Sequence, residues 1–240
     1  MESNKLIGYF GHPPRDVLDA WRARLGLPLV DLDVAIGAPE AGLVPHNYCQ
    51  IITNIVSTAV ELRDRLEVII AAVGEEKCDQ GRFAARLLAD LGLAVMETRN
   101  PVLAPRRALV IATSRLPLRE KIVRIMDTVH TDDPGPYEQC APVAGFWGVP
   151  PHDLSLLDLF PNETHVYGWT RCVEAGVPAD FELECSVDEG VPTVFFSQTF
   201  CAKQLLAKYL AHKHGGLYVD ADGPINASTA AKVEAFLRLS

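Results

Sequence analysis

The chain contains one short passage twice. The first copy reads Ile7-Gly8-Tyr9-Phe10-Gly11-His12-Pro13-Pro14, and the second reads Ala144-Gly145-Phe146-Trp147-Gly148-Val149-Pro150-Pro151. Later in each half an apolar run leads to a cysteine, Cys78 or Cys201, and a glycine follows each cysteine after the same 14 positions. Self-similarity of this kind restricts the fold to related structural units. We therefore expect an internal repeat that places a thiol at the same point of each unit.

The pattern of apolar residues predicts an α/β fold. Residues 67–73 are nearly all apolar, as in a parallel strand buried on both faces, and residues 81–91 have helical periodicity. Alternating strands and helices imply parallel sheets with right-handed crossovers. We expect two Rossmann-like units, residues 1–130 and 143–240, joined by a Pro- and Gly-rich linker at 131–142. Asp79 and Ser228 are the expected caps of two of the helices.

The individual elements follow from the same periodicity and from the positions of Gly and Pro. The predicted strands cover residues 5–10, 27–32, 67–73, 93–97, 143–146, 165–169, 191–197 and 216–219. The predicted helices cover residues 16–25, 50–65, 81–91, 118–129, 151–160, 201–212 and 229–239.

Charge and composition exclude several classes of protein. The net charge is −9 and the pI about 5.2, which argues against binding nucleic acid or acidic membranes. The sequence contains no run of 18 apolar residues, so we expect no membrane span. The N-terminus does not resemble a signal peptide. We expect a cytoplasmic protein, in which disulfides are rare. Its thiols are then free, ligating or catalytic, and they are Cys49, Cys78, Cys140, Cys172, Cys185 and Cys201.

Three of these cysteines are candidate metal ligands. Cys78 and Cys201 each lie where a predicted buried strand passes into a helix, the edge at which α/β sheets collect ligands. Cys49 follows a comparable loop, and its counterpart in the second half is Gly168, which leaves three thiols and one open metal position. Cys172 is an alternative fourth ligand. Since cysteine is also a common buried residue, purely structural thiols remain an alternative.

Acid–base candidates lie close to the same positions in the sequence. His12 and His152 are in or beside the two Pro-Pro turns, and His46 is in the loop before Cys49. Glu76 comes just before Cys78. Exposed turn histidines and a solvated acidic loop are the alternatives. The chain has no P-loop, G-x-G-x-x-G or G-x-S-x-G motif, so nucleotide-dependent kinases and serine hydrolases have no residue support.

Several of these segments together resemble one family. They are the opening Ile7-Gly8-Tyr9-Phe10 with the helix that follows it, Cys49, the pair Cys78-Asp79, the pair Phe200-Cys201, and the closing helix at 230–237. In order and context they resemble the D-component family of 2-hydroxyacyl-CoA dehydratases, which also contains benzoyl-CoA reductase subunits. The resemblance covers residues 5–100 and 190–238. The chain is shorter than family members, with 123 positions from Cys78 to Cys201.

The resemblance implies a cofactor and a chemistry. It implies two Rossmann-like domains with a [4Fe–4S] cluster between them, held by Cys49, Cys78 and Cys201. In such dehydratases the open iron meets the thioester carbonyl of an acyl-CoA, and one electron makes a ketyl radical that expels the hydroxyl group. A related subunit and an ATP-hydrolysing activase supply that electron. Because an open iron needs water and oxygen excluded and this short chain offers little cover, we also expect a homo- or hetero-oligomer with a related subunit.

The expected function is therefore low-potential one-electron reduction by an iron–sulfur enzyme subunit, of the lyase or oxidoreductase type and working anaerobically. His46, His12, His152 and Glu76 are its expected catalytic residues. Two alternatives stay open. One is a partner subunit whose cluster only relays electrons. The other is a two-lobed protein that binds a small ligand without a cluster.

Overall fold

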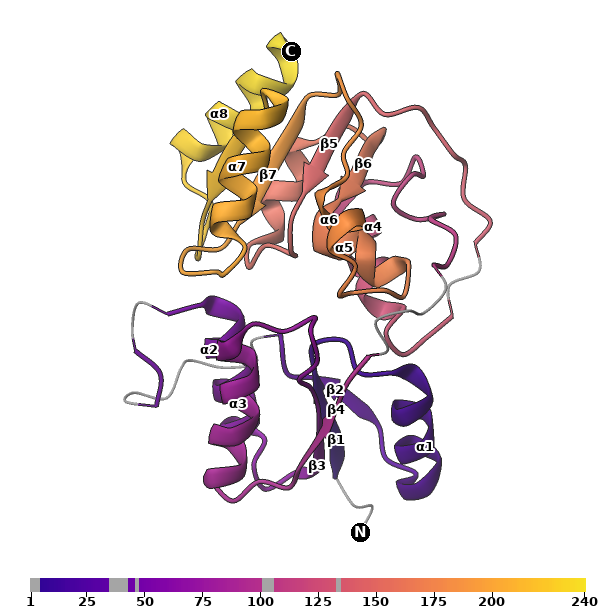
Figure 1. Cartoon of the computed structure of the whole chain (residues 1–240), viewed down its shortest axis with the longest axis vertical. Helices are drawn as coiled ribbons and strands as arrows, with labels where there is room; N and C mark the ends of the chain where they lie inside the picture. The colour runs from indigo at the N-terminus through magenta and orange to yellow at the C-terminus, as the bar shows by residue number, and fades with distance from the viewer. Residues whose placement is uncertain (1–4, 35–42, 46–47, 101–105, 133–134) are drawn as a thin grey trace. The chain divides into compact units, whose positions relative to one another are not determined.

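The computed structural model describes residues 5–34, 43–45, 48–100, 106–132 and 135–240. By its internal contacts the chain divides into two compact units, Met1–Val102 and Leu103–Ser240. Each unit has its own four-stranded sheet (Figure 1). Across the described ranges, no helix combines the length and the apolar character that crossing a membrane requires.

The first unit is a parallel sheet with helices on both faces. Its strands pair in the order β2-β1-β3-β4, and every pairing is parallel. Helix α1 lies on one side of the sheet, and α2 and α3 lie on the other (Figure 1). The elements are β1 Leu6–Phe10, α1 Arg15–Leu25, β2 Leu29–Asp31, α2 Gln50–Glu61, β3 Leu66–Ala72, α3 Asp79–Asp90 and β4 Val95–Thr98.

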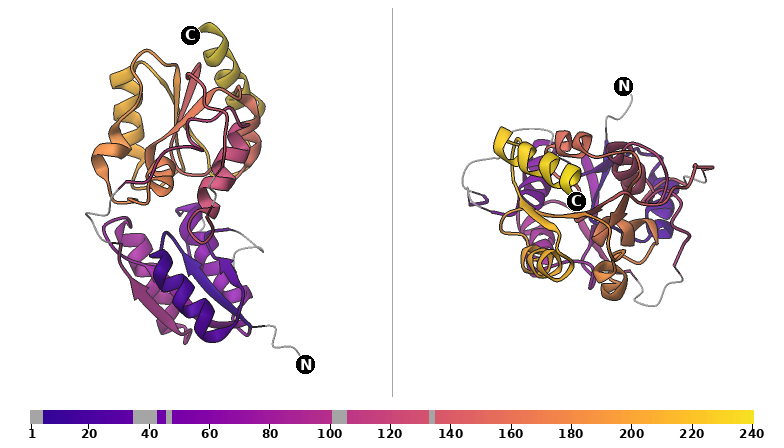
Figure 2. Two further views of the ribbon diagram at one scale, coloured as in Figure 1. Left: turned by 90° about the vertical axis from the view of Figure 1, so that its right-hand side faces the viewer. Right: turned by 90° about the horizontal axis from the view of Figure 1, so that it is seen from above.

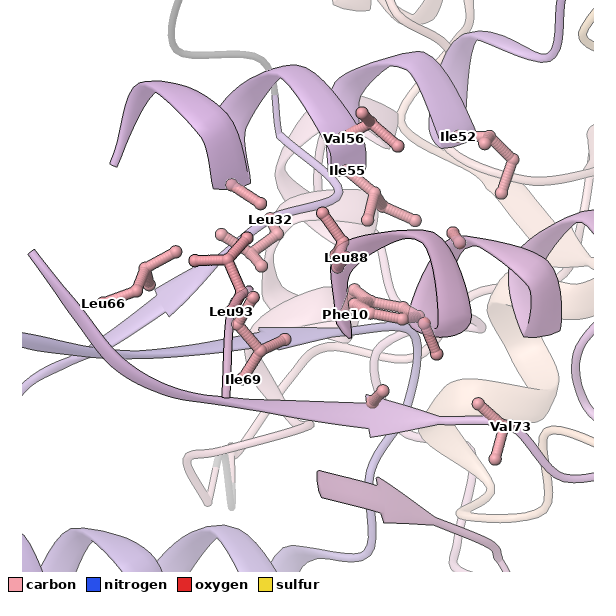
Figure 3. Packing of buried hydrophobic residues seen from close by; sticks show 14 of the residues in the cluster. Phe10, Leu32, Ile52, Ile55, Val56, Leu66, Ile69, Val73, Leu88 and Leu93 are labelled. Atoms are coloured by element: carbon pink, nitrogen blue, oxygen red, sulfur yellow. The ribbon is translucent and has the colours of Figure 1, made fainter. Parts of the chain in front are cut away.

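The core of this unit joins the sheet to α2 and α3 (Figure 3). Helix α2 places apolar residues at helical spacing on its inner face, including the fully buried Ile55 and the nearly buried Val56. These side chains pack with Leu88 from α3 and with Phe10 and Ile69 from the central strands. Full burial of one such side chain stabilises the fold by about 1.5–3 kcal/mol, so this cluster holds α2 and α3 against the sheet.

The second unit has a parallel sheet with the strand order β6-β5-β7-β8. A 3-10 helix, η1, follows β5, and α8 packs against it and against β8. The side view in Figure 2 shows helices on both faces of this sheet as well. The elements are α4 Leu118–Asp127, β5 Ala144–Trp147, η1 Leu154–Leu159, β6 Thr164–Tyr167, α5 Gly168–Glu174, α6 Phe181–Cys185, β7 Thr193–Ser197, α7 Gln204–His214, β8 Leu217–Asp220 and α8 Ala227–Leu239.

The expectation of an α/β fold with two parallel sheets is confirmed. Some local predictions were wrong. The segment predicted as a helix at 151–160 is a 3-10 helix at Leu154–Leu159, where the Asp153 carboxylate accepts the N–H of Ser155. The cap of the last helix is Asn226 rather than Ser228, because the Asn226 side chain accepts the N–H of Thr229 at 2.9 Å. The cap position of α3 is Cys78, one residue before Asp79.

The contacts within each unit place the boundary between the units after Val102. The linker predicted from the sequence lies at 131–142. Residues from 106 onward join the second unit through buried polar side chains. The Lys121 ammonium of α4 donates to the carbonyls of Asn162 and Thr164, at 2.9 and 2.5 Å. Burial lowers the pKa of Lys121 to about 8. These bonds hold α4 against β6.

A second anchor holds the segment before α4. The Glu174 carboxylate, at the end of α5, accepts the backbone N–H groups of Val110, Ile111 and Ala112 at 2.6–2.9 Å. The carbonyl of Ala112 in turn accepts the N–H of Val166 at 3.0 Å, beside the outer strand β6. Glu174 is 4% exposed, so this segment is fastened to the second unit by a buried carboxylate instead of by a strand ladder.

Candidate thiol site at the carboxyl edge of the first sheet

Two of the predicted ligands, Cys49 and Cys78, occupy equivalent places in the first unit. Each is the residue immediately before a helix, Cys49 before α2 and Cys78 before α3. Both helices begin at the carboxyl edge of the parallel sheet and lie in contact. The strand order reverses direction between β1 and β3, which is where open α/β sheets bind ligands. The fold thus brings these two thiols to one edge.

The Cys49 thiol is buried, with 5% of the residue exposed, and its pKa is raised above the ordinary value. Burial is the main cause, since it disfavours the thiolate. The backbone N–H groups of Ile52 and Ile51, in the first turn of α2, act in the opposite direction. Cys78 is close enough to raise the pKa of Cys49 further, and the Lys77 ammonium is close enough to lower it. Cys49, Cys78 and Lys77 therefore form one electrostatic group.

Lys77 reaches from the loop before α3 to the end of β1. Its Nζ lies 5.9 Å from the centre of the Phe10 ring, a cation–π contact. Its side chain crosses Gly11, which has a φ of 72°, and a Cβ at Gly11 would collide with the lysine. The ammonium is thereby held over the carboxyl edge of the central strand. Sequence reasoning missed Lys77, because its partners lie far away in the chain.

We expect Lys77→Met to raise the pKa of Cys49, since the substitution removes a positive charge that stabilises the thiolate. The 13Cβ chemical shift of Cys49, followed by nuclear magnetic resonance as pH is raised, gives the midpoint directly. The control is Lys5→Met, because Lys5 pairs with Glu67 at the opposite, amino edge of the sheet. An unchanged Cys49 midpoint in Lys77→Met would contradict the assignment.

Two of the predicted acid–base residues are buried at the same edge. Glu76 is 8% exposed, its Oε1 accepts the N–H of Gly74 at 3.1 Å, and its Oε2 is buried without a hydrogen-bond partner. His12 follows β1, is 3% exposed, and its backbone carbonyl accepts the Asn100 amide. Both side chains therefore lie in the fold and not in a solvated turn. His46 lies outside the described residues.

Asp33, which sequence reasoning also missed, lies at this edge after β2. Its Oδ2 accepts the N–H of Gly11 at 2.8 Å, and its backbone carbonyl accepts the Asn54 amide of α2. These bonds tie the ends of β1 and β2 to α2. The two aspartates of Asp31-Leu32-Asp33, at the end of a short strand, were the signal that could have indicated it.

The other predicted residues lie at the carboxyl edge of the second sheet. Cys201 follows β7 and is half-buried, and His152 follows β5 and is exposed. Phe200, directly before Cys201, has a φ of 59°, which is unusual for a bulky side chain. Backbone conformations of this kind are often retained at functional sites.

The alternative fourth ligand, Cys172, has the features of a structural thiol. It is fully buried in α5, and its Sγ donates to the carbonyl of Asp180 at 3.6 Å. Burial is the first cause that raises its pKa to about 12. Its full burial and its hydrogen bond to the backbone are those of a thiol that packs in the core.

The first unit supplies donors that suit an iron–sulfur cluster. Thiolates are the ligands such clusters prefer, and the first turns of α2 and α3 favour bound negative charge. The Lys77 ammonium adds positive charge beside Cys49. Within the part of the chain that the structure describes, no group of three or more His, Cys, Asp or Glu side chains gathers as a metal site. The described contacts thus bring two of the three predicted ligands to the same sheet edge.

A cavity of about 390 Å³ opens beside these residues, at the carboxyl ends of β3 and β4. It is lined by Val73, Gly74, Glu75, Arg82, Arg99 and Asn100. A second hollow, of about 650 Å³, lies at the end of α1 and the start of β2, on the opposite edge of the sheet from both thiols.

The fold and the site thus define an α/β protein with two parallel sheets and a thiol pair at one sheet edge. No protein-family model and no curated protein matches the chain. Two structures of RedJ, a thioesterase from the prodiginine biosynthetic pathway in Streptomyces coelicolor, show a weak likeness, one of them with a PEG molecule bound in the active site. Identity is 13% and the TM-score 0.25 in both. The alignments cover 99% and 98% of this chain and 91% and 89% of those chains. A TM-score of this size carries no argument about fold or function.

Proposed function

We propose that the chain is an iron–sulfur enzyme subunit that carries out low-potential one-electron reduction. In this proposal Cys49 and Cys78 are two ligands of a [4Fe–4S] cluster, and Cys201 of the second unit is the third. One observation carries it: Cys49 and Cys78 lie at the starts of two adjacent helices at the carboxyl edge of a parallel sheet, and Cys78 is close enough to raise the pKa of Cys49. When bound, the cluster would supply single electrons at low potential.

The side chains around the thiols have roles that follow from their chemistry. Lys77 offsets the negative charge of the thiolates, and the N–H groups at the start of α2 do the same. Glu76, with its buried and unpartnered Oε2, is one proton-transfer candidate at this edge. The other proton-transfer candidates are His12 at the same edge, and His152 and His46, which the sequence analysis proposed.

Cluster loading must remove a proton from Cys49. Burial raises the pKa of this thiol, so the metal-free chain carries it protonated at neutral pH. Because only the thiolate binds metal, loading releases this proton and is favoured as pH rises toward the pKa of the thiol.

The substrate and partners follow from the resemblance in the sequence. Reductive dehydration of a 2-hydroxyacyl-CoA is the proposed reaction, with a related subunit in an oligomer and an ATP-dependent activase as electron donor. We also propose that the two units are an internal repeat, since both sheets have the same relative strand order and each third strand leads to a cysteine. An experimental structure in which the sheets superpose with Cys78 on Cys201 is the expected result, and mismatched strands would refute the repeat.

Anaerobic purification tests the cluster. The protein should be brown, absorb broadly near about 400 nm, and contain about four irons and a similar amount of sulfide per chain. Reduction should produce an electron paramagnetic resonance signal. Colourless protein without sulfide after anaerobic reconstitution would refute the proposal. A spectral change on adding an acyl-CoA distinguishes a catalytic subunit from an electron relay.

A second candidate, a small-ligand-binding protein without a cluster, is favoured by one observation. The cavity of about 390 Å³ at the same edge has the size of a small-molecule site and is lined by charged and amide side chains. Iron and sulfide analysis separates this candidate from the first.

A further inference from the structure

The cavity between the ends of β3 and β4 contains two arginines whose positions are set by the fold. Arg82 lies in the first turns of α3, and Arg99 directly follows the last residue of β4. Strands β3 and β4 are paired in parallel, so their carboxyl ends lie side by side. Both arginines therefore line one cavity, Arg82 from α3 and Arg99 from the position just after β4.

Arg82 is held in place by the backbone. Its Nη2 donates to the carbonyl of Gly74 at 3.1 Å, at the end of β3. Its Nη1 lies 3.7 Å from Asp79, whose side chain is fully exposed, so this ion pair contributes little. A guanidinium has five N–H donors, and these contacts leave donors for a ligand. Fixing the side chain before binding reduces the ordering that a ligand must impose.

The rest of the cavity lining consists mainly of polar and charged side chains, one of them negative. Arg99 is exposed and carries a full positive charge. The Asn100 amide donates to the carbonyl of His12, which fixes this wall to the end of β1. Glu75, also exposed, is the carboxylate among the lining residues. Two guanidinium groups against one carboxylate leave the lining positive in a chain of net charge −9.

We propose that this cavity binds the oxyanion group, carboxylate or phosphate, of a small ligand, and that Arg82 and Arg99 recognise it. The planar guanidinium forks match both groups through paired hydrogen bonds. The location at the carboxyl edge of a parallel sheet is where α/β folds bind such ligands. The site does not depend on a metal at Cys49 and Cys78, so this proposal holds even if the chain binds no iron–sulfur cluster.

Titration of the full-length chain with inorganic phosphate, and separately with propionate, tests the site. Backbone amide signals of Gly74, Arg99 and Asn100 should shift saturably in two-dimensional nuclear magnetic resonance spectra at constant ionic strength. Saturation by phosphate alone assigns a phosphate group, and saturation by propionate assigns a carboxylate. The absence of saturable shifts with either anion would overturn the proposal.

Matched variants separate recognition from general charge effects. Arg99→Gln should weaken binding about tenfold or more, because it removes a charge-assisted hydrogen-bond donor. Glu75→Gln should strengthen binding, because it removes the opposing charge. The control is Arg86→Gln, which changes charge equally on α3 but lies outside the lining and pairs with Asp90. Equal weakening by Arg86→Gln and Arg99→Gln would overturn the proposal. All three positions are exposed, so these variants should fold.

Discussion

Replacement of Cys78 by serine is expected to remove the cluster almost completely. Iron and sulfide should fall from about four to less than about one per chain, and the absorbance near about 400 nm should disappear. The reason is that serine lacks the soft thiolate that holds iron. Cys78 is exposed, so its replacement should leave the fold intact, whereas Cys49 belongs to the buried core. The measurement is iron and sulfide content after anaerobic purification, with the circular dichroism spectrum as a check of folding.

The matched control is Cys185→Ser in α6, a half-buried thiol outside the predicted ligand set. It should keep its full iron content. Cys201→Ser should behave like Cys78→Ser, because the proposal makes both residues ligands. Normal iron in Cys78→Ser would contradict the ligand assignment, and loss of iron in Cys185→Ser would point to a general effect of thiol removal.

Glu174→Ala is expected to destabilise the protein by about 3–5 kcal/mol. The substitution leaves the backbone N–H groups of Val110, Ile111 and Ala112 without the carboxylate that accepts them. Each buried donor left unpaired costs about 1–3 kcal/mol. For a chain of this size the melting temperature should fall by about 10 °C or more, measured by differential scanning calorimetry.

The control for this prediction is Glu189→Ala, which removes an exposed carboxylate from the loop before β7. Its melting temperature should stay within about 2 °C of the parent protein. A similar small change in Glu174→Ala would show that the segment at 110–112 does not depend on this side chain.

The sequence predicted the elements well where a strand is buried on both faces or a helix buries one face. The apolar run at 67–73 corresponds to β3, Leu66–Ala72, and the periodic residues of α2 and α3 face the core as expected. Strand–loop–helix spacing therefore placed Cys49 and Cys78 correctly at the starts of two helices. That placement depends only on local patterns, which periodicity can detect.

The missed features depend on contacts between distant residues. Helix α5 is buried at every position from Gly168 to Glu174, so it has no solvent-exposed face that would mark it by periodicity. The preceding strand was instead expected to continue to Trp169. Lys77 was missed because its position over Phe10 and Gly11 follows from the sheet order. The Glu174 anchor joins residues more than 60 positions apart.

The contact between Val166 and Ala112 has a consequence for how the folded protein behaves at high concentration. An outer strand with free main-chain groups can recruit a strand from another molecule and start aggregation. Here an irregular segment, pinned by Glu174, already occupies that side of β6. A strand from another molecule is thereby prevented from pairing with the outer edge of β6, although no further strand of this chain covers that edge.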